Sequence, residues 1–162
     1  INIANHVEEF KNISLIINTS AKLKNNHNFK VLLIGSGKDT DYYKELIKEL
    51  KLEDYIFILG TKSNPYPYLK NSDCLLFTSK YEGYGLVLNE AKVLGVPIIT
   101  SNCGASEEIV TKEYGDIFYK DSEFEKLMVD FINKPNKKKT IFDYKKFNKK
   151  ITNEFKNIIG EE

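Results

Sequence analysis

The sequence predicts an α/β protein, a three-layer sandwich in which helices cover both faces of a mostly parallel sheet of about six strands. Two observations support this fold class. Short apolar runs alternate along the chain with longer segments in which apolar residues recur at helical spacing. The runs VLLIG and CLLFT are apolar at consecutive positions, as is typical of strands buried on both faces. We therefore expect a single domain over residues 1–162.

The expected strands are the short apolar runs. They are Ile1–Ala4, Phe29–Ile34, Ile56–Leu59, Asp73–Thr78, Pro97–Thr100 and Asp116–Tyr119. Because helical segments lie between these runs, the chain is expected to form βαβ units, in which successive strands are parallel.

The expected helices are segments with apolar residues three or four positions apart. In the first of them Ile13, Ile16 and Ile17 fall on one face, and in the third Leu88 and Ala91 do so. The helices are Lys11–Leu23, Asp41–Leu50, Gly85–Leu94, Glu123–Ile132 and Asp143–Ile159, the last being the C-terminal helix within residues 141–160. The lysine-rich stretch Asn133–Thr140 is expected to be a solvated linker into that helix.

Composition excludes several classes of protein. The chain is 41% hydrophobic, which is too apolar for intrinsic disorder, and its net charge of +1 gives no reason to expect a nucleic-acid partner. Neither cysteine has a companion at metal-site or redox spacing. No apolar run could span a bilayer, and no signal peptide is present, so a cytoplasmic location is expected. The chain begins in strand-like residues without methionine, and we expect it to be part of a longer protein.

The stretch LLIGSGKDT is a strand, a glycine turn and a helix start. A P-loop would need glycine where Leu32 stands and serine or threonine at Asp39, and a dinucleotide fingerprint would need glycine at Thr40. Both motifs are therefore excluded. Two interpretations stay open: a plain turn, or a wall of a nucleotide pocket formed by Gly35 and Gly37 at the carboxyl ends of the strands.

The segment EGYGLVLNE follows the expected strand DCLLFTS and contains the start of the third helix. Gly83 and Gly85 allow backbone N–H groups to point outward, and a helix N-terminus adds unpaired N–H groups and a positive dipole end. Such a terminus suits a diphosphate. Glu82 and Glu90 lie at the two ends of the segment, and carboxylates suit the hydroxyls of sugar rings.

Two interpretations of the glutamates are possible. Each could be a solvated surface residue, or both could contact one ligand from two sides. Glu90 favours the second interpretation, because it stands among Leu88, Ala91 and Leu94, where a polar residue needs a partner.

The stretch Asn64–Val110 resembles the carboxyl-terminal nucleotide-sugar-binding domain of family 4 retaining glycosyltransferases, which have the GT-B fold. The hallmark of that family is two glutamates separated by seven residues and followed by A-x-x-x-G-x-P. Its positions are matched here by Glu82, Glu90, Ala91, Gly95 and Pro97. The resemblance extends from Phe10 to the last helix, and it implies a Rossmann-like domain forming the C-terminal half of a GT-B enzyme.

The resemblance also implies roles for individual residues. Glu82 would contact hydroxyls of the transferred sugar and Lys11 would neutralise the diphosphate, which makes these two the expected catalytic residues. Glu90 would bind the ribose of the donor nucleotide. The remaining donor-binding residues would be Gly83, Tyr84, Gly85 and Leu86 at the sugar and diphosphate, Gly35 and Gly37 beside the nucleotide, and Gly60, Thr61 and Lys62 at the base.

One position departs from the family pattern. The family usually has Gly-Arg shortly before the lysine, and the corresponding pair here is Ala4-Asn5. Asn5 can form hydrogen bonds but cannot neutralise a diphosphate, so binding is expected to depend on Lys11 and the helix dipole. His6, beside it, is expected to be a surface residue.

The predicted function is therefore donor binding in a retaining glycosyltransferase of bacterial surface polysaccharide biosynthesis, such as lipopolysaccharide or capsule. The donor would be a nucleotide-diphosphate sugar, with UDP-sugars favoured, carrying a hexose or N-acetylhexosamine. The acceptor would be a glycan or lipid-linked molecule bound by an N-terminal domain outside this chain, without which transfer should be slow or absent.

No metal or cofactor and no nucleic acid are expected, while the full-length protein could associate peripherally with the cytoplasmic membrane. Two alternatives remain: a non-catalytic nucleotide-sugar-binding domain and a GT-B-type epimerase.

Overall fold

The computed structural model describes residues 1–134 and 142–159, and within the last helix it describes side chains up to Lys149 and those of Thr152 and Asn153. Six parallel strands lie in it: β1 (Asn2–Ile3), β2 (Val31–Ile34), β3 (Ile56–Gly60), β4 (Leu75–Phe77), β5 (Ile98–Ser101) and β6 (Gly115–Phe118). They form two three-stranded ladders, in the orders β1-β2-β3 and β4-β5-β6.

The two ladders meet where β1 lies beside β4. The N–H of Leu76 donates to the carbonyl of Ile1 at 2.7 Å, and the side-chain amide of Asn2 donates to the carbonyl of Leu76 at 2.9 Å. The strands are thus arranged in the spatial order β3-β2-β1-β4-β5-β6. The Rossmann-like α/β class is confirmed, whereas the expected single sheet of about six strands is replaced by two short ladders, because β1 is only two residues long.

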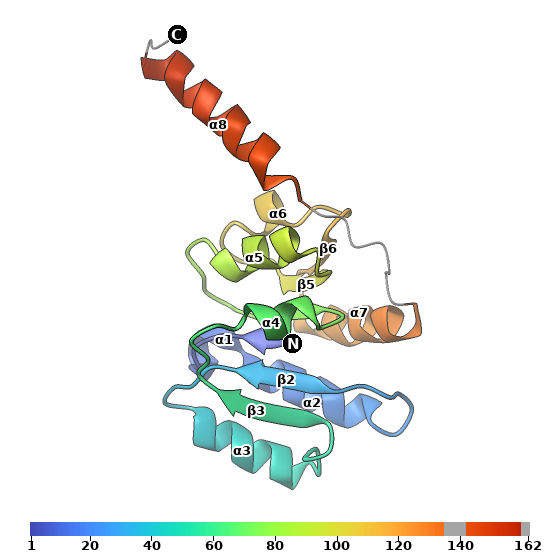
Figure 1. Cartoon of the computed structure of the whole chain (residues 1–162). Helices are drawn as coiled ribbons and strands as arrows, with labels where there is room; N and C mark the ends of the chain where they lie inside the picture. Colours follow the sequence, from blue (N-terminus) through green and yellow to red (C-terminus); the bar gives the residue numbers. More distant parts are fainter. Residues whose placement is uncertain (135–141, 160–162) are drawn as a thin grey trace.

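Helices cover both faces of the strands (Figure 1). They are α1 (Glu8–Lys11), α2 (Ile13–Leu23), α3 (Thr40–Glu49), α4 (Tyr66–Lys70), α5 (Leu86–Leu94), α6 (Ser106–Ile109), α7 (Asp121–Asn133) and α8 (Tyr144–Ile159). The expected linker Asn133–Thr140 falls mostly on residues 135–141, which lie outside the described residues, as do residues 160–162. No helix in the described part of the chain is long and apolar enough to cross a membrane.

Two apolar cores lie on opposite faces of the strands. Adjacent residues of one strand belong to different cores, as Leu75 and Leu76 of β4 do, because successive side chains point to opposite faces. One core packs the strands against α2, α3 and α7, and the other packs them against α4, α5 and α6. This arrangement confirms the three layers expected from runs such as VLLIG and CLLFT.

The helix expected at Lys11–Leu23 is divided in two at Asn12. Asn12 has φ of 49°, in the left-handed region, which ends α1 and lets α2 begin at Ile13. The carboxylate of Glu8 accepts hydrogen bonds from the backbone N–H of Ser14 at 3.0 Å and from the hydroxyl of Tyr43 at 2.9 Å. Glu8 therefore provides an acceptor for the N–H of Ser14, which lies in the first turn of α2 and has no carbonyl partner within that helix.

Candidate functional site

The site expected from the sequence lies at the carboxyl ends of the strands, at the start of α5. Gly85 takes the N-cap position of α5 with φ of 77°, a conformation that favours glycine. Among the described residues, no hydrogen bond is recorded from the backbone N–H groups of Gly83, Tyr84 or Gly85. Space around Gly83 is open, with no heavy atom within 4 Å of where a Cβ would stand. These N–H groups are available to an anion, and the helix dipole favours one.

A cavity of about 510 Å³ lies between α1 and the β4–α5 loop and contains both expected catalytic residues. The ammonium of Lys11 donates to Oε2 of Glu82 at 2.5 Å, and their side chains are 19% and 23% exposed. Lys11 reaches this position because α1 lies over the end of β4, where the N–H of Lys80 donates to the carbonyl of Phe10 at 2.8 Å. The remaining walls come from the loop after β5, including Asn102, Cys103 and Gly104.

A second cavity, of about 420 Å³, lies between the ends of β1, β2 and β3. It is lined by Asn5, Gly35, Thr61 and Lys62, among others. The hydroxyls of Ser36 and Thr61 are 2.8 Å apart and join the two loops that form its rim. The structure thus brings together the turn and the segment after β3 that the sequence analysis assigned to the nucleotide.

The glycines of the LLIGSGKDT turn have a structural explanation. Gly35 has φ of 133°, and a Cβ on it would lie 1.8 Å from the carbonyl oxygen of Ala4. A Cβ on Gly37 would lie 2.4 Å from the carbonyl oxygen of His6. Both glycines therefore let this turn pack against the segment after β1, which supports the plain-turn interpretation without excluding a ligand beside Gly35.

A third cavity, of about 400 Å³, follows the exposed side of α5 and contains Glu90. Its other lining residues are Tyr66, Leu86, Asn89, Val93 and Leu94. The hydroxyl of Tyr66 donates to Oε1 of Glu90 at 3.4 Å. Glu90 and Glu82 consequently line different cavities, one on each side of the start of α5.

The three cavities separate the predicted site residues into groups. Lys11, Glu82 and Gly83 share one, Gly35, Thr61 and Lys62 share another, and Leu86 and Glu90 share the last. None of these three cavities is lined by Gly37, Gly60, Tyr84 or Gly85. Tyr66 was not among the predicted site residues, although its place between two prolines in the segment NPYPYLK could have indicated a rigid turn at the site. Asn102, Cys103 and Gly104 were not predicted either, and their loop follows β5 at the same edge.

The expectation that His6 is a surface residue is wrong. The side chain is fully buried, its Nδ1 lies 3.0 Å from the hydroxyl of Thr40, and its Nε2 has no partner among the described residues. Its backbone binds the glycine turn, since its N–H donates to Ser36 at 3.0 Å and its carbonyl accepts from Asp39 at 3.1 Å. Burial lowers the pKa of His6, because the charged ring loses its hydration.

The two cysteines differ in environment. Cys74 is buried in one core, as expected for a small hydrophobe, and burial raises the pKa of its thiol to about 12. Cys103 is half-buried and lines the cavity of Lys11 and Glu82. Burial also raises the pKa of Cys103, and a hydrogen bond from Ser101 acts in the opposite direction.

No group of three or more His, Cys, Asp or Glu side chains is placed to hold a metal ion within the described residues. The chain does contain one Asp-x-Asp sequence, at Asp39–Asp41. Asp39 accepts the N–H of Glu8 at 2.8 Å, and Asp41 pairs with Lys44 at 2.8 Å. Both carboxylates are therefore engaged by the protein itself.

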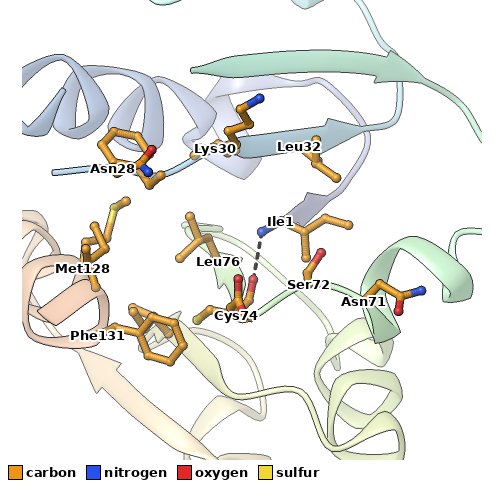
Figure 2. A pocket seen from close by; sticks show the side chains of 15 residues that line it. Ile1, Asn28, Lys30, Leu32, Asn71, Ser72, Cys74, Leu76, Met128 and Phe131 are labelled. Atoms are coloured by element: carbon orange, nitrogen blue, oxygen red, sulfur yellow. Dashed lines mark hydrogen bonds between the residues drawn. The ribbon is translucent and has the colours of Figure 1, made fainter. Parts of the chain in front are cut away.

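A further cavity, of about 500 Å³, lies at the opposite, amino-terminal edge of the strands (Figure 2). Leu32 of β2 and Leu76 of β4 line it together with Ile1, which directly precedes β1, and Met128 and Phe131 approach it from α7. The amino group of Ile1 donates to the carbonyl of Cys74 at 2.8 Å. None of the predicted site residues lines this cavity.

The family model of glycosyl transferases group 1 matches residues 1–149. The N-acetyl-alpha-D-glucosaminyl L-malate synthase of Bacillus anthracis is 33% identical over 117 residues, covering 70% of this chain and 30% of that protein. The N-acetylgalactosamine-N,N'-diacetylbacillosaminyl-diphospho-undecaprenol 4-alpha-N-acetylgalactosaminyltransferase of Campylobacter jejuni is 32% identical over 119 residues, covering 72% and 32%. The chain thus spans about a third of the length of these relatives.

Solved structures with the same fold include glycosyltransferases. Anabaena HepE in complex with UDP superimposes with a TM-score of 0.77 at 21% identity, covering 96% of this chain and 48% of that one. The C-terminal domain of a group 1 glycosyl transferase (LpcC) from Francisella tularensis superimposes with a TM-score of 0.65 at 24% identity, covering 82% and 74%. The fold is therefore that of the C-terminal domain of GT-B glycosyltransferases.

Proposed function

Because this chain belongs to the group 1 glycosyl transferases, we propose that it is the domain that holds the nucleotide-diphosphate sugar from which a hexose or N-acetylhexosamine is transferred. The sugar passes to a glycan or lipid-linked acceptor during the synthesis of a bacterial surface polysaccharide. The acceptor is bound by residues outside this chain. Relatives named for O-antigen and amylovoran biosynthesis support this setting.

One observation carries the proposal: the N–H groups of Gly83, Tyr84 and Gly85, which have no recorded hydrogen bond in the part of the chain that the structure describes, lie next to a cavity that contains Lys11 and Glu82. A diphosphate over these N–H groups gains the helix dipole and the ammonium of Lys11, while a sugar attached to it reaches Glu82. The helix N-terminus and the cation thus match the diphosphate of a nucleotide sugar, and the carboxylate matches the hydroxyls of the sugar attached to it.

The nucleoside half of the donor occupies the two other cavities. Glu90 accepts hydrogen bonds from ribose hydroxyls, while Thr61 and Lys62 border the base and Gly35 and Ser36 form the opposite wall. We favour UDP as the nucleotide, since structures of the same fold were solved with UDP, including HepE and the O-GlcNAc transferase GtfA.

The transfer proceeds with retention of anomeric configuration. Lys11 and the N-terminus of α5 stabilise the charge that develops on the leaving diphosphate, and Glu82 holds the hydroxyls of the sugar as positive charge develops on its ring. These groups meet the diphosphate charge without a metal ion or cofactor. The chain by itself binds the donor and turns over little, because the acceptor site lies elsewhere.

Calorimetry of the chain with UDP, GDP and ADP tests donor binding. We expect the tightest binding for UDP, and we expect Glu90→Ala to weaken it about tenfold, the loss of a hydrogen bond to a charged group. Glu45→Ala, on the exposed face of α3, is the matched control and should bind as the unaltered chain does. Unchanged UDP affinity in Glu90→Ala would remove the ribose assignment, and no binding of any of the three nucleotides would overturn the proposed function.

A further inference from the structure

Tyr66 is the one recorded hydrogen-bond partner of Glu90 in the part of the chain that the structure describes. Its hydroxyl donates to Oε1 of Glu90 at 3.4 Å, and no ion pair of Glu90 is recorded there. The cavity around this carboxylate is otherwise formed mainly by the apolar side chains of Leu86, Val93 and Leu94. A carboxylate in such surroundings depends on a donor to hold one orientation.

The position of Tyr66 is fixed by the segment that carries it. Proline residues precede and follow it, and Pro65 and Pro67 restrict φ at the first turn of α4. The N–H of Tyr66 donates to Oδ1 of Asn64 at 3.2 Å, and Leu69, three residues later, is fully buried against α5 and its strand layer. The ring is therefore held beside α5 although it is 48% exposed.

We propose that Tyr66 is a positioning residue that orients the carboxylate of Glu90 for the ribose diol of the donor nucleotide. The hydroxyl of Tyr66 donates a hydrogen bond to Oε1 of Glu90, so that Oε2 faces the ligand and accepts hydrogen bonds from the ribose hydroxyls. A carboxylate already held in one rotamer loses less conformational freedom on binding, which makes binding tighter. This inference rests on the proposed function, because it needs Glu90 to bind ribose.

The proposal implies a preference for donors with an intact ribose. An oriented carboxylate distinguishes a ribonucleoside diphosphate from one that lacks the 2′- and 3′-hydroxyls, since only the first offers donors to it. Tyr66 should therefore affect the binding of UDP and have no effect on 2′,3′-dideoxyuridine diphosphate.

The test is calorimetry of Tyr66→Phe, which keeps the ring and removes the hydroxyl. We expect UDP to bind about three- to tenfold more weakly, as for the loss of one hydrogen bond, and dideoxyuridine diphosphate to bind as it does to the unaltered chain. In the double variant with Glu90→Ala, which removes the acceptor, Tyr66→Phe should add little further loss, because both changes remove the same interaction.

Tyr119→Phe is the matched control. It removes another Tyr–Glu hydrogen bond at the surface, from the hydroxyl of Tyr119 to Oε1 of Glu107 at 3.0 Å, and Tyr119 lines none of the three cavities at the site. UDP should bind to it as to the unaltered chain. Thermal unfolding of all variants checks that each one is folded.

The outcomes separate this proposal from the proposed function. If Glu90→Ala weakens UDP binding and Tyr66→Phe does not, Tyr66 has no positioning role while the ribose assignment stands. Equal weakening of UDP and dideoxyuridine diphosphate by Tyr66→Phe would show a general structural effect and overturn the proposal. If Glu90→Ala has no effect on UDP binding, the ribose assignment and the positioning role of Tyr66 fall together, while donor binding by the chain stands as long as UDP still binds.

Discussion

The ammonium of Lys11 and a carboxylate oxygen of Glu82 are 2.5 Å apart, although 71 residues separate them in the chain. The pair closes a cavity between α1 and the loop that leads into α5. Each of these residues therefore neutralises the charge of the other. A diphosphate that enters the cavity competes with Glu82 for the same ammonium.

Replacement of the two members of this pair should have opposite effects on the binding of UDP. Lys11→Met should weaken binding about tenfold, because a charge-assisted hydrogen bond to the diphosphate is lost. Glu82→Gln should strengthen it by up to about fivefold, because a partly exposed ion pair of at most about 1 kcal/mol no longer has to open. Lys22→Met is the control, since Lys22 pairs with Glu125 on the remote side of α2. Titration calorimetry measures all three, and weaker UDP binding in Glu82→Gln would contradict this prediction.

The two cysteines should differ in their reaction with iodoacetamide. Cys103 is half-buried at the wall of the Lys11–Glu82 cavity, and Cys74 is buried in the core, where its pKa is about 12. Reaction needs an accessible thiolate. We expect Cys103 to be alkylated slowly in the folded protein and Cys74 only after unfolding, as peptide mass spectrometry would measure. A UDP-sugar should slow the alkylation of Cys103, and alkylation of Cys74 first would contradict its burial.

The stability of the protein should decrease in acid partly because of His6. Burial lowers the pKa of His6 below its unfolded value of about 6.5, so the unfolded chain binds the proton more readily. Hence the free energy of unfolding falls as pH drops below about 6.5 and stops falling, for this residue, below the folded pKa. His6→Gln should flatten this dependence in urea unfolding measured at successive pH values. An unchanged pH dependence in His6→Gln would contradict this prediction.

Lys92 should stabilise the packing of the segment before α8 onto α5. Its side chain is 7% exposed, and its ammonium lies 4.7 Å from the ring centre of Tyr114 and 4.4 Å from that of Phe142. Lys92→Ala should lower the free energy of unfolding by about 1–3 kcal/mol, through lost packing of the stem and lost cation–π contacts. Lys48→Ala, exposed on α3, should change it by less than about 0.5 kcal/mol. If urea unfolding showed the same decrease in the free energy of unfolding for both variants, the two aromatic contacts of Lys92 would contribute nothing to stability.

Two glycines of the predicted site should respond differently to alanine. At Gly35 a Cβ would lie 1.8 Å from the carbonyl oxygen of Ala4, and φ is 133°. Gly35→Ala should therefore lower the free energy of unfolding by more than about 3 kcal/mol or prevent folding. At Gly83 nothing lies within 4 Å, so Gly83→Ala should change stability by less than about 1 kcal/mol. Denaturant unfolding decides this, and a stable Gly35→Ala protein would contradict the close packing of the turn.

The fold class could be predicted from the sequence alone, and the same patterns predict where the site lies. Strands and helices differ in the period of their apolar residues, so the alternation of VLLIG-type runs with helical segments was enough to predict three layers. The hallmark of Glu82 and Glu90 identified the segment at the start of α5, because its spacing lies within one stretch of chain. Even here, the division of the first helix at Asn12 depended on contacts of Glu8 with Ser14 and Tyr43 that periodicity does not encode.

Which of the predicted site residues lie close together depends on the tertiary structure. Lys11 lies beside Glu82 because the β1–α1 segment passes over the end of β4, and Glu90 lies beside Tyr66 because α4 packs near α5. His6 is buried because the segment after β1 covers the glycine turn, so its polar character in the sequence was misleading. Sequence patterns report local backbone geometry, whereas each of these contacts depends on how strands distant in sequence are ordered in space.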